Sequence, residues 1–439
     1  MLTAEENDLL CRVEGAAPMG ALMRRHWLPA CMSEEIAEPD GTPLRVRLLG
    51  EDLVAFRDSQ GRVGVVDEHC PHRGASLALG RNGACGLTCL YHGWKVDVEG
   101  RVVATPSEPP TSTLGTKVRH LAYPAREAGG FVWVYMGPRE AMRELEPPAF
   151  APTPTTQVAI VKIHVACNWA QILEGAIDSA HSSTLHSTDM PAANVDRALA
   201  EGGVWPRPSD DRAPRFEIES TSYGFRYAAI RKPIRNPETH DYVRITAFLA
   251  PSTALIPPNN VYRLANVNVP IDDTNTMFYF IAWSESGAGI DTGAWREFCR
   301  ARVGIELDAR YRPIRTRDND YLQDREAMKG GDHTGIPGIP TQDIAMWETM
   351  GAITDRSRER LGSSDTAIVR FRKLMLDAVQ RMARGEPAIG TTAPRVPHAD
   401  VRAYEGIVPK SVDWRTLGGS REPEAASPGG EDRAARAAS

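Results

Sequence analysis

The sequence predicts an α+β fold with two domains, an all-β domain first and a mixed domain after it. Short β-branched or aromatic runs separated by Gly and Asp turns fill the chain from about Pro43 to Tyr135. The proline-rich stretch PPAFAPTPTT at 147–156 then marks a joint. Beyond it the chain mixes strands such as YVRITAFLAP with helical patterns such as TAIVRFRKLMLDAVQRMARG, where apolar residues recur every three or four positions.

These patterns divide the chain into four predicted segments. A Thr-x-x-Glu capping box starts a short N-terminal helix, and residues 1–26 are expected to pack on the second domain. Residues 27–146 are expected to form the all-β domain, and residues 147–418 the mixed domain. The tail at 419–439 is rich in Gly, Ala, Ser and charged residues, so it is expected to be disordered.

Composition excludes several classes of function. Of the 439 residues, 42% are hydrophobic and 25% are charged, which is ordinary for a soluble globular protein. The net charge of −6, with Lys and Arg scattered along the chain, argues against a nucleic-acid surface. The sequence contains no apolar run of about 18 residues that could span a membrane, and its first residues lack the basic and apolar regions of a signal peptide. A cytoplasmic protein is therefore expected. The seven cysteines are irregularly spaced, which argues against a disulfide framework.

Two short stretches of the first domain each carry one cysteine and one histidine. Cys70 and His72 stand in CPHRGA, and Cys89 and His92 stand in CLYHGWK. Structural zinc usually pairs cysteine with cysteine and histidine with histidine, so zinc is the less favoured interpretation. One Cys and one His per loop suit a two-iron cluster, in which one iron takes both thiolates and the other both imidazoles.

A second metal pattern lies in CNWAQILEGAIDSAHSSTLH, at 167–186, which has helical character. It contains Asp178, His181 and His186. The two histidines are roughly 140° apart around an ideal helix, so both reach one metal only if the helix opens near SST. A third, carboxylate ligand must lie farther along the chain. Spacing does not choose among the candidates, which are Asp318, Asp320, Asp324, Asp332, Asp343 and Asp355.

CPHRGA followed by CLYHGWK resembles the Rieske [2Fe–2S] motif of the Rieske non-haem iron ring-hydroxylating oxygenases. The resemblance extends to the segment with the two histidines, to DNDYLQDREAM, and to GIPTQDIAMWETMGAITDRSRERLGSSD, which is similar to the phthalate dioxygenase branch. It implies a Rieske domain, followed by a catalytic domain with a helix-covered antiparallel sheet. It also implies two cofactors, a [2Fe–2S] cluster and a mononuclear Fe(II).

The same resemblance assigns roles to individual residues. Asp343, the aspartate of the QD pair, is implied to complete a two-His-one-carboxylate triad with His181 and His186. The other interpretation of Asp343 is a carboxylate at the N-terminus of a helix. Asp178 is implied to hydrogen-bond His181 and to reach His92 of the partner subunit, as an inter-subunit electron bridge.

Arginines in the second domain could hold the carboxylates of an aromatic acid. Arg244 shares a strand face with aromatic side chains in DYVRITAF, and Arg207 lies on the proline-stiffened loop VWPRPSD. The other interpretation is that these arginines are solvated. Arg226 and Arg231, in YGFRYAAIRK, are reserves on the same argument. Two hydroxyls beside the metal pattern complete the candidate substrate residues, Ser179 and Ser182.

The expected function is that of a terminal oxygenase component that adds both atoms of O2 to an aromatic acid, most simply phthalate, to give a 4,5-cis-dihydrodiol. The resemblance implies an NADH-dependent flavin and iron–sulfur reductase as partner, and a homotrimer or a hexamer of stacked trimers. Alternatives within the class are a monooxygenase or O-demethylase, or a dioxygenase of isophthalate, chlorobenzoate or an aryl sulfonate. Outside the class, a Rieske electron-transfer protein would leave the second domain unexplained.

Overall fold

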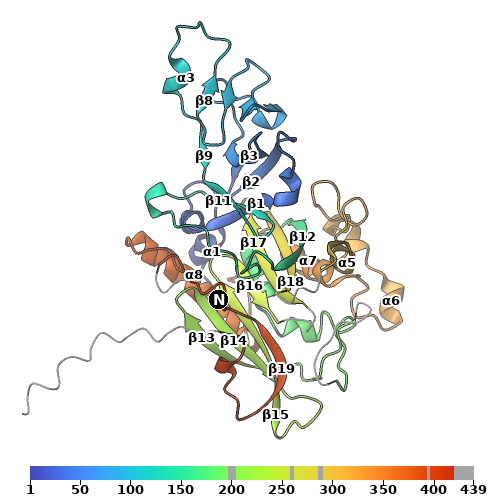
Figure 1. Cartoon of the computed structure of the whole chain (residues 1–439). Coiled ribbons are helices and arrows are strands. Elements are labelled where there is room, and N and C mark those ends of the chain that lie inside the picture. The colour runs from blue at the N-terminus through green and yellow to red at the C-terminus, as the bar shows by residue number, and fades with distance from the viewer. Residues whose placement is uncertain (196–203, 258–261, 285–289, 393–395, 420–439) are drawn as a thin grey trace, which may run out of the picture.

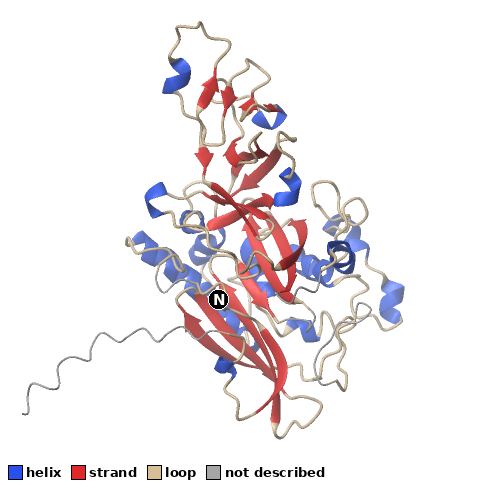
Figure 2. Cartoon of the chain, viewed as in Figure 1, coloured by secondary structure: helices blue, strands red, loops and turns tan. Residues whose placement is uncertain are grey.

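The computed structural model describes residues 1–195, 204–257, 262–284, 290–392 and 396–419. Within these residues the strands form four sheets, three small ones in the first part of the chain and one large one in the second. Figure 2 shows that the upper part of the molecule is largely strand and loop, whereas most helices belong to the lower part. The predicted α+β fold, with an all-β Rieske part and a helix-covered antiparallel sheet, is confirmed.

The first part is built from short antiparallel strands in three sheets, ordered β1-β11-β10, β2-β3-β4-β9 and β5-β6-β7-β8. Their bounds are β1 Trp27–Met32, β2 Leu44–Leu48, β3 Glu51–Arg57, β4 Val63–Asp67, β5 Arg81–Asn82, β6 Leu87–Thr88, β7 Lys95–Val96, β8 Val102–Ala104, β9 Ala122–Tyr123, β10 Ala125–Ala128 and β11 Phe131–Tyr135. Short helices connect them, namely η1 Ser33–Ile36, η2 Leu77–Leu79, α3 Leu114–Lys117 and η3 Arg139–Ala141.

The second part is organised around an eight-stranded antiparallel sheet in the order β12-β18-β17-β16-β15-β14-β13, with β19 also paired to β15. Its strands are β12 Gln157–Val165, β13 Arg215–Thr221, β14 Gly224–Arg231, β15 His240–Leu249, β16 Thr253–Ile256, β17 Arg263–Pro270, β18 Thr276–Ser284 and β19 Tyr404–Pro409. The remaining helices are α1 Ala4–Cys11, α2 Pro18–Met23, α4 Trp169–Ala176, η4 His181–Ser183, α5 Thr292–Phe298, η5 Arg317–Leu322, α6 Arg325–Lys329, α7 Ile339–Thr349, η6 Ser363–Asp365, α8 Thr366–Ala383 and η7 Trp414–Thr416.

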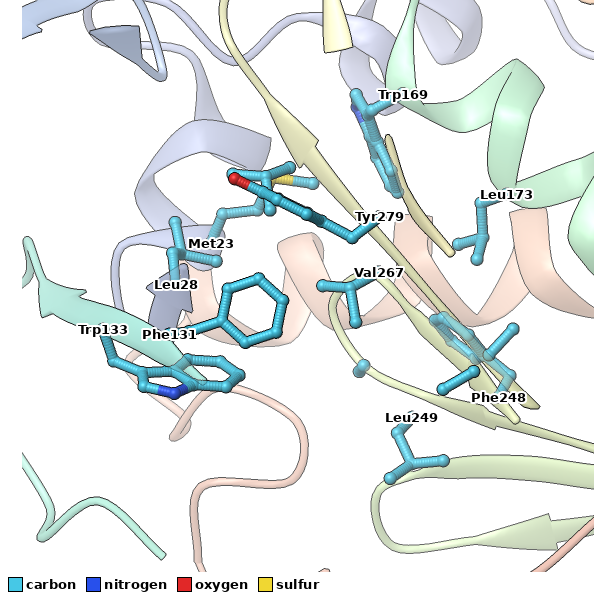
Figure 3. Packing of buried hydrophobic residues seen from close by; sticks show 14 of the residues in the cluster. Met23, Leu28, Phe131, Trp133, Trp169, Leu173, Phe248, Leu249, Val267 and Tyr279 are labelled. Atoms are coloured by element: carbon cyan, nitrogen blue, oxygen red, sulfur yellow. The ribbon is translucent and has the colours of Figure 1, made fainter. Parts of the chain in front are cut away.

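The two faces of the large sheet have different neighbours. On one face, Phe248 of β15 packs against Phe371 of α8, which in turn packs against Trp169 of α4, so helices cover this face. On the other face, Tyr279 of β18 meets Phe131 of β11 at a ring-centroid distance of 4.9 Å. Figure 3 labels Phe131, Trp169, Phe248 and Tyr279, which belong with Phe371 to one continuous core that joins the first part of the chain to the second. The sheet is therefore held rigidly between the helices and the first part.

The N-terminal helix α1 begins with the predicted capping box. The Thr3 hydroxyl accepts the Glu6 N–H, and the Glu6 carboxylate accepts the Thr3 N–H. Figure 1 shows α1 close to the long helix α8, and the two helices are in contact. The predicted domain boundaries at 26/27 and 146/147 stay predictions, and apart from Gly419 the tail predicted to be disordered lies outside the described residues. Among the described residues, no helix has the length and hydropathy of a membrane span.

Candidate metal centres and substrate pocket

Two loops of matching conformation bring together the four predicted cluster ligands. The Gly74 N–H donates to the Cys70 carbonyl at 2.8 Å, and the Gly93 N–H donates to the Cys89 carbonyl at 3.0 Å. Both glycines have a φ of 73°, a left-handed conformation that residues with a Cβ rarely adopt. The glycine four residues after each cysteine therefore closes a tight loop, and the two loops place the rings of His72 and His92 side by side.

The four side chains divide into a buried pair and a partly exposed pair. Cys70 and Cys89 are each 3% exposed, whereas the rings of His72 and His92 are partly exposed and lie 4.5 Å apart between centroids. Burial raises the pKa of the Cys70 thiol, and the neighbouring Cys89 raises it further. Two thiols on the protein side and two imidazoles on the solvent side fit a [2Fe–2S] cluster with one iron of each ligand type.

The second predicted centre is assembled from two distant segments. His181 and His186 come from the segment around η4, and Asp343 comes from α7. The Nε2 atoms of His181 and His186 lie 3.4 and 3.1 Å from Oδ1 of Asp343, and the three ligand atoms all lie within 4.8 Å of one another. Two imidazoles and one carboxylate at this spacing fit a single metal ion.

The helix before this centre ends earlier than the sequence suggested. The expected opening near Ser182 is wrong, because α4 stops at Ala176 and Ile177 already leaves the helix. Asp178 causes the turn that follows, since its Oδ1 accepts the backbone N–H groups of Ala180 at 2.7 Å and His181 at 3.3 Å. The two histidines therefore lie on an irregular segment, where both rings can face Asp343.

A close approach of two helices sets the distance between these segments. A Cβ added to Gly175 of α4 would lie 2.2 Å from Nε1 of Trp347, on α7. Only a glycine at this position lets α7 pack so closely on α4. Asp343 lies in the middle of α7, so the interpretation of Asp343 as a helix N-terminal carboxylate does not fit the described structure.

An acceptor oxygen faces the other ring nitrogen of each histidine. Asp178 Oδ2 lies 3.5 Å from Nδ1 of His181, and Gln342 Oε1 lies 2.6 Å from Nδ1 of His186. The Gln342 amide nitrogen donates to Asp189 Oδ2 at 2.8 Å, which leaves its oxygen as the acceptor of an Nδ1 proton. Both Nε2 atoms are then free to bind a metal. Sequence reasoning missed Gln342, although it is the other half of the QD pair.

Two carboxylates face the ring of His181 and shift its pKa. Burial by itself lowers the pKa of His181, but the carboxylates of Asp178 and Asp343 outweigh burial and raise it. The pKa of Asp178 is lowered despite its burial, because His181 and two backbone N–H groups stabilise the carboxylate. A site with this much negative charge attracts a cation into the space between the rings.

A pocket opens beside the metal-binding residues and contains about 700 Å³ of empty space, including the part open to solvent. One wall is apolar and is formed by Trp205, Leu264, Phe278, Phe280 and Trp347. The polar side of the lining comes from β14, β15 and the segment around η4. The strand register explains this arrangement, because Tyr227 pairs with Thr246 and Asn266 with Phe280, which places all four on the helix-covered face.

Three buried arginines lie close to the polar side of this pocket. Arg207, Arg231 and Arg244 are 5%, 2% and 8% exposed, and the Nε atom of each has no hydrogen-bond partner among the described residues. Glu405 lies 3.6 Å from Nη1 of Arg244. Burial and the neighbouring charge of Arg244 lower the pKa values of Arg207 and Arg231 to about 10. Among the described residues, no carboxylate lies within 4.0 Å of the guanidinium nitrogens of Arg207 or Arg231, and of the three arginines Glu405 faces only Arg244, so the cluster favours an anionic ligand.

The predicted substrate residues differ in where they lie. Arg244, Ser179 and Ser182 line the pocket, and Arg207 contacts it through Ser182. The reserve residue Arg226 lies on the opposite face of β14, where it donates to the carbonyls of Leu417 and Gly419 at 2.6 and 3.1 Å. Arg226 is therefore corrected to a residue that holds the C-terminal segment.

Comparisons with known proteins agree with this geometry. Residues 26–119 match the Rieske [2Fe-2S] domain, and residues 134–436 match the family described as LigXa C-terminal domain like. The phthalate 4,5-dioxygenase oxygenase subunit of Pseudomonas putida is 60% identical over 94% of each chain. The chain belongs to the Rieske non-haem iron ring-hydroxylating oxygenases. The 3-chlorobenzoate-3,4-dioxygenase oxygenase subunit of Comamonas testosteroni is 38% identical over 95% of this chain and 98% of that protein.

Solved structures show the same fold at low sequence identity. Dicamba monooxygenase bound to dicamba gives a TM-score of 0.58 at 17% identity, over 83% of this chain and 99% of that chain. The terminal oxygenase of carbazole 1,9a-dioxygenase from Nocardioides aromaticivorans gives 0.57 at 18% identity, over 85% and 97%. As a member of this family, the chain is an oxidoreductase with a Rieske cluster and a mononuclear iron. The alternative of an electron-transfer protein without a catalytic domain is excluded.

Proposed function

We propose that the chain is the oxygenase component that converts phthalate to its 4,5-cis-dihydrodiol, with O2 and electrons from an NADH-dependent flavin and iron–sulfur reductase. The observation that carries the proposal is the group of buried arginines beside the candidate iron site, with guanidinium N–H groups that lack partners. The 60% identity to a phthalate 4,5-dioxygenase subunit supports the same substrate.

The proposed cofactor ligands follow from the two centres. Cys70, His72, Cys89 and His92 would hold the cluster. His181, His186 and Asp343 would hold the mononuclear iron, with Asp178 and Gln342 orienting the two rings. When both are bound, the cluster supplies electrons and the iron activates O2 for addition to the aromatic ring.

The pocket has the groups that a vicinal diacid needs. Arg244 and Arg207 would each take one carboxylate, with the Ser179 hydroxyl beside them, whereas the Ser182 hydroxyl holds Arg207 in place. The Tyr242 hydroxyl donates to Glu405 at 2.7 Å, and Glu405 in turn faces Arg244, so the guanidinium is held in place before substrate arrives. The apolar wall would pack on the ring and exclude water from its face.

Asp178 would connect the two kinds of metal centre between subunits. Its Oδ1 atom is used by two backbone N–H groups, and its Oδ2 atom faces His181, which leaves lone pairs for a second imidazole. Its side chain is 22% exposed, so another molecule can approach it. We place His92 of the partner subunit there, which requires a homo-oligomer, a trimer or two stacked trimers.

A single turnover tests the substrate and the reaction together. Iron-loaded protein is reduced chemically, mixed with phthalate and labelled O2, and the product is analysed by mass spectrometry. The proposal predicts a dihydrodiol with two labelled oxygen atoms. One labelled atom would indicate a monooxygenase, and product from 3-chlorobenzoate or isophthalate but not from phthalate would move the function to another aromatic acid.

A further inference from the structure

Arg231 is a buried cation to which the proposed clamp gives no role. It is the last residue of β14 and lies on the same sheet face as Tyr242, its partner in the register. Its Nη2 atom donates to the Ser179 carbonyl at 2.6 Å and to the Ser183 hydroxyl at 3.5 Å, and its Nη1 atom donates to the Ser179 hydroxyl at 3.3 Å. These contacts attach the strand to the segment that carries His181.

Arg207 holds the same segment at a neighbouring residue. Its Nη1 atom donates to the Ser182 hydroxyl at 3.0 Å, and its Nη2 atom donates to the Ser182 carbonyl at 3.1 Å. The segment between Asp178 and His186 is thus held by two buried guanidinium groups. Charge-assisted hydrogen bonds of this kind are among the strongest in proteins, so the segment has little freedom to shift.

The two serine hydroxyls differ in what they can offer a substrate. The Ser182 hydroxyl already donates to the Ser179 carbonyl at 3.1 Å and accepts from Arg207. The Ser179 hydroxyl accepts from Arg231, and its own proton has no acceptor among the described residues. Because Arg231 occupies one side of this oxygen, the O–H bond points away from Arg231, and Ser179 lines the pocket. Ser179 is therefore a free donor, whereas Ser182 is not.

We propose that Arg231 is a positioning residue that acts through Ser179, by fixing its backbone and by directing its hydroxyl proton at a substrate carboxylate. The inference deepens the proposed function and rests on it, because it requires an aromatic acid in this pocket. In this arrangement Arg244 and Arg207 pair with the negative charges of the substrate. Arg231 makes no such pair but fixes the direction in which the neutral Ser179 hydroxyl donates. A guanidinium that donates to a hydroxyl oxygen also polarises its O–H bond and makes it a better donor.

A double-mutant cycle on phthalate binding tests this role. Calorimetry on iron-loaded protein compares the wild type, Arg231→Lys, Ser179→Ala and the double variant. Each single substitution should weaken binding about tenfold, because a charged hydrogen bond is lost or misdirected. In the Ser179→Ala background, Arg231→Lys should weaken binding by no more than about threefold, because its target is gone. The matched control is Arg226→Lys on the opposite face of the same strand, which should stay within about twofold of the wild type.

The remaining outcomes separate this inference from the proposed function. Losses that multiply to about 100-fold in the double variant would overturn the role of Arg231 while phthalate remains the substrate. Loss of iron from Arg231→Lys, measured on the same samples, would also overturn it, since Arg231 would then hold the metal segment and not the substrate. A wild type that does not bind phthalate would overturn the proposed function itself, and the inference with it.

Discussion

The cluster loops and the substrate pocket differ in where their groups come from and in how well those groups are satisfied. Each cluster loop takes its ligands from a few neighbouring residues and closes on its own backbone hydrogen bonds. The pocket takes its groups from β14, β15, the segment around η4 and α7, which are distant in the sequence. The pocket also buries guanidinium N–H groups without partners. A buried N–H donor without an acceptor destabilises the folded protein unless a ligand accepts its hydrogen bond. The location of these donors therefore indicates that the pocket binds a ligand with acceptor oxygens.

The two regions also differ in exposure. The imidazoles of His72 and His92 are partly exposed, and Leu90 and Tyr91 beside them are 62% and 57% exposed. His186 is 3% exposed and lies inside the second part. An exposed cluster suits electron exchange with another protein, whereas a buried metal beside an apolar wall suits chemistry that must exclude water. Substitutions made in one region at a time should therefore affect electron supply, metal binding and substrate binding independently.

The largest effect is expected when one region loses its metal and the other does not. His181→Ala should lower the iron content from about three to about two irons per chain and abolish turnover, because one ligand of the mononuclear site is removed. The visible spectrum of the cluster should stay unchanged. Iron analysis and absorption spectroscopy on the same sample check both statements, and loss of the cluster spectrum would mean that the two centres are not independent.

The next effect concerns the proposed connection between the regions. Asp178→Asn should retain about three irons per chain and normal phthalate affinity, yet turnover should fall about 100-fold, because the carboxylate that joins two metal-bound imidazoles is neutralised. Rapid mixing of the reduced variant with O2 and phthalate should show slow reoxidation of the cluster. Normal reoxidation and normal turnover would remove Asp178 from the electron path.

A smaller effect is expected from the clamp. Arg244→Ala should weaken phthalate binding about 30-fold, in line with the loss of about 2 kcal/mol from a charge-assisted hydrogen bond, and should leave both metals in place. Calorimetry measures the affinity, and iron analysis on the same sample provides the control. Unchanged affinity would place the carboxylate-binding groups elsewhere in the pocket.

The smallest effect is expected from the partner of a metal-binding ring. Gln342→Leu should weaken iron binding at the mononuclear site about tenfold, because the His186 ring loses the acceptor that fixes its Nδ1 proton. Titration of the metal-free site with Fe(II) measures the change. Iron affinity equal to that of the wild type would mean that Asp343 and the packing around His186 are sufficient to orient the ring.

Local features could be predicted from the sequence, and features that depend on strand register could not. Cys70, His72, Cys89 and His92 are marked by their spacing, because each pair lies in one short loop. Only the family resemblance indicates Asp343, since no local pattern shows which distant aspartate the fold brings to the two histidines. The sequence predicts an opening near Ser182, but the helix ends at Ala176, and the Asp178 side chain holds the turn that follows it.

The arginines of β14 show most clearly what the sequence alone does not determine. Strand alternation already puts Arg226 and Arg231 on opposite faces of β14. Which face is the pocket face follows only from the register, in which Arg231 pairs with Tyr242 and Ala229 with Arg244. A shift of one residue would exchange the two arginines, and nothing in the sequence of either strand fixes that register. Arg231 could therefore be named as a reserve but not assigned a role.

The buried arginines beside the iron site are proposed to select a diacid. Calorimetric titration of the iron-loaded protein with phthalate and with benzoate, under the same buffer and salt, tests this proposal most directly. Phthalate should bind about 30-fold or more tightly than benzoate, because its second carboxylate satisfies a buried guanidinium that benzoate leaves unpaired. Equal affinity for the two acids would contradict it.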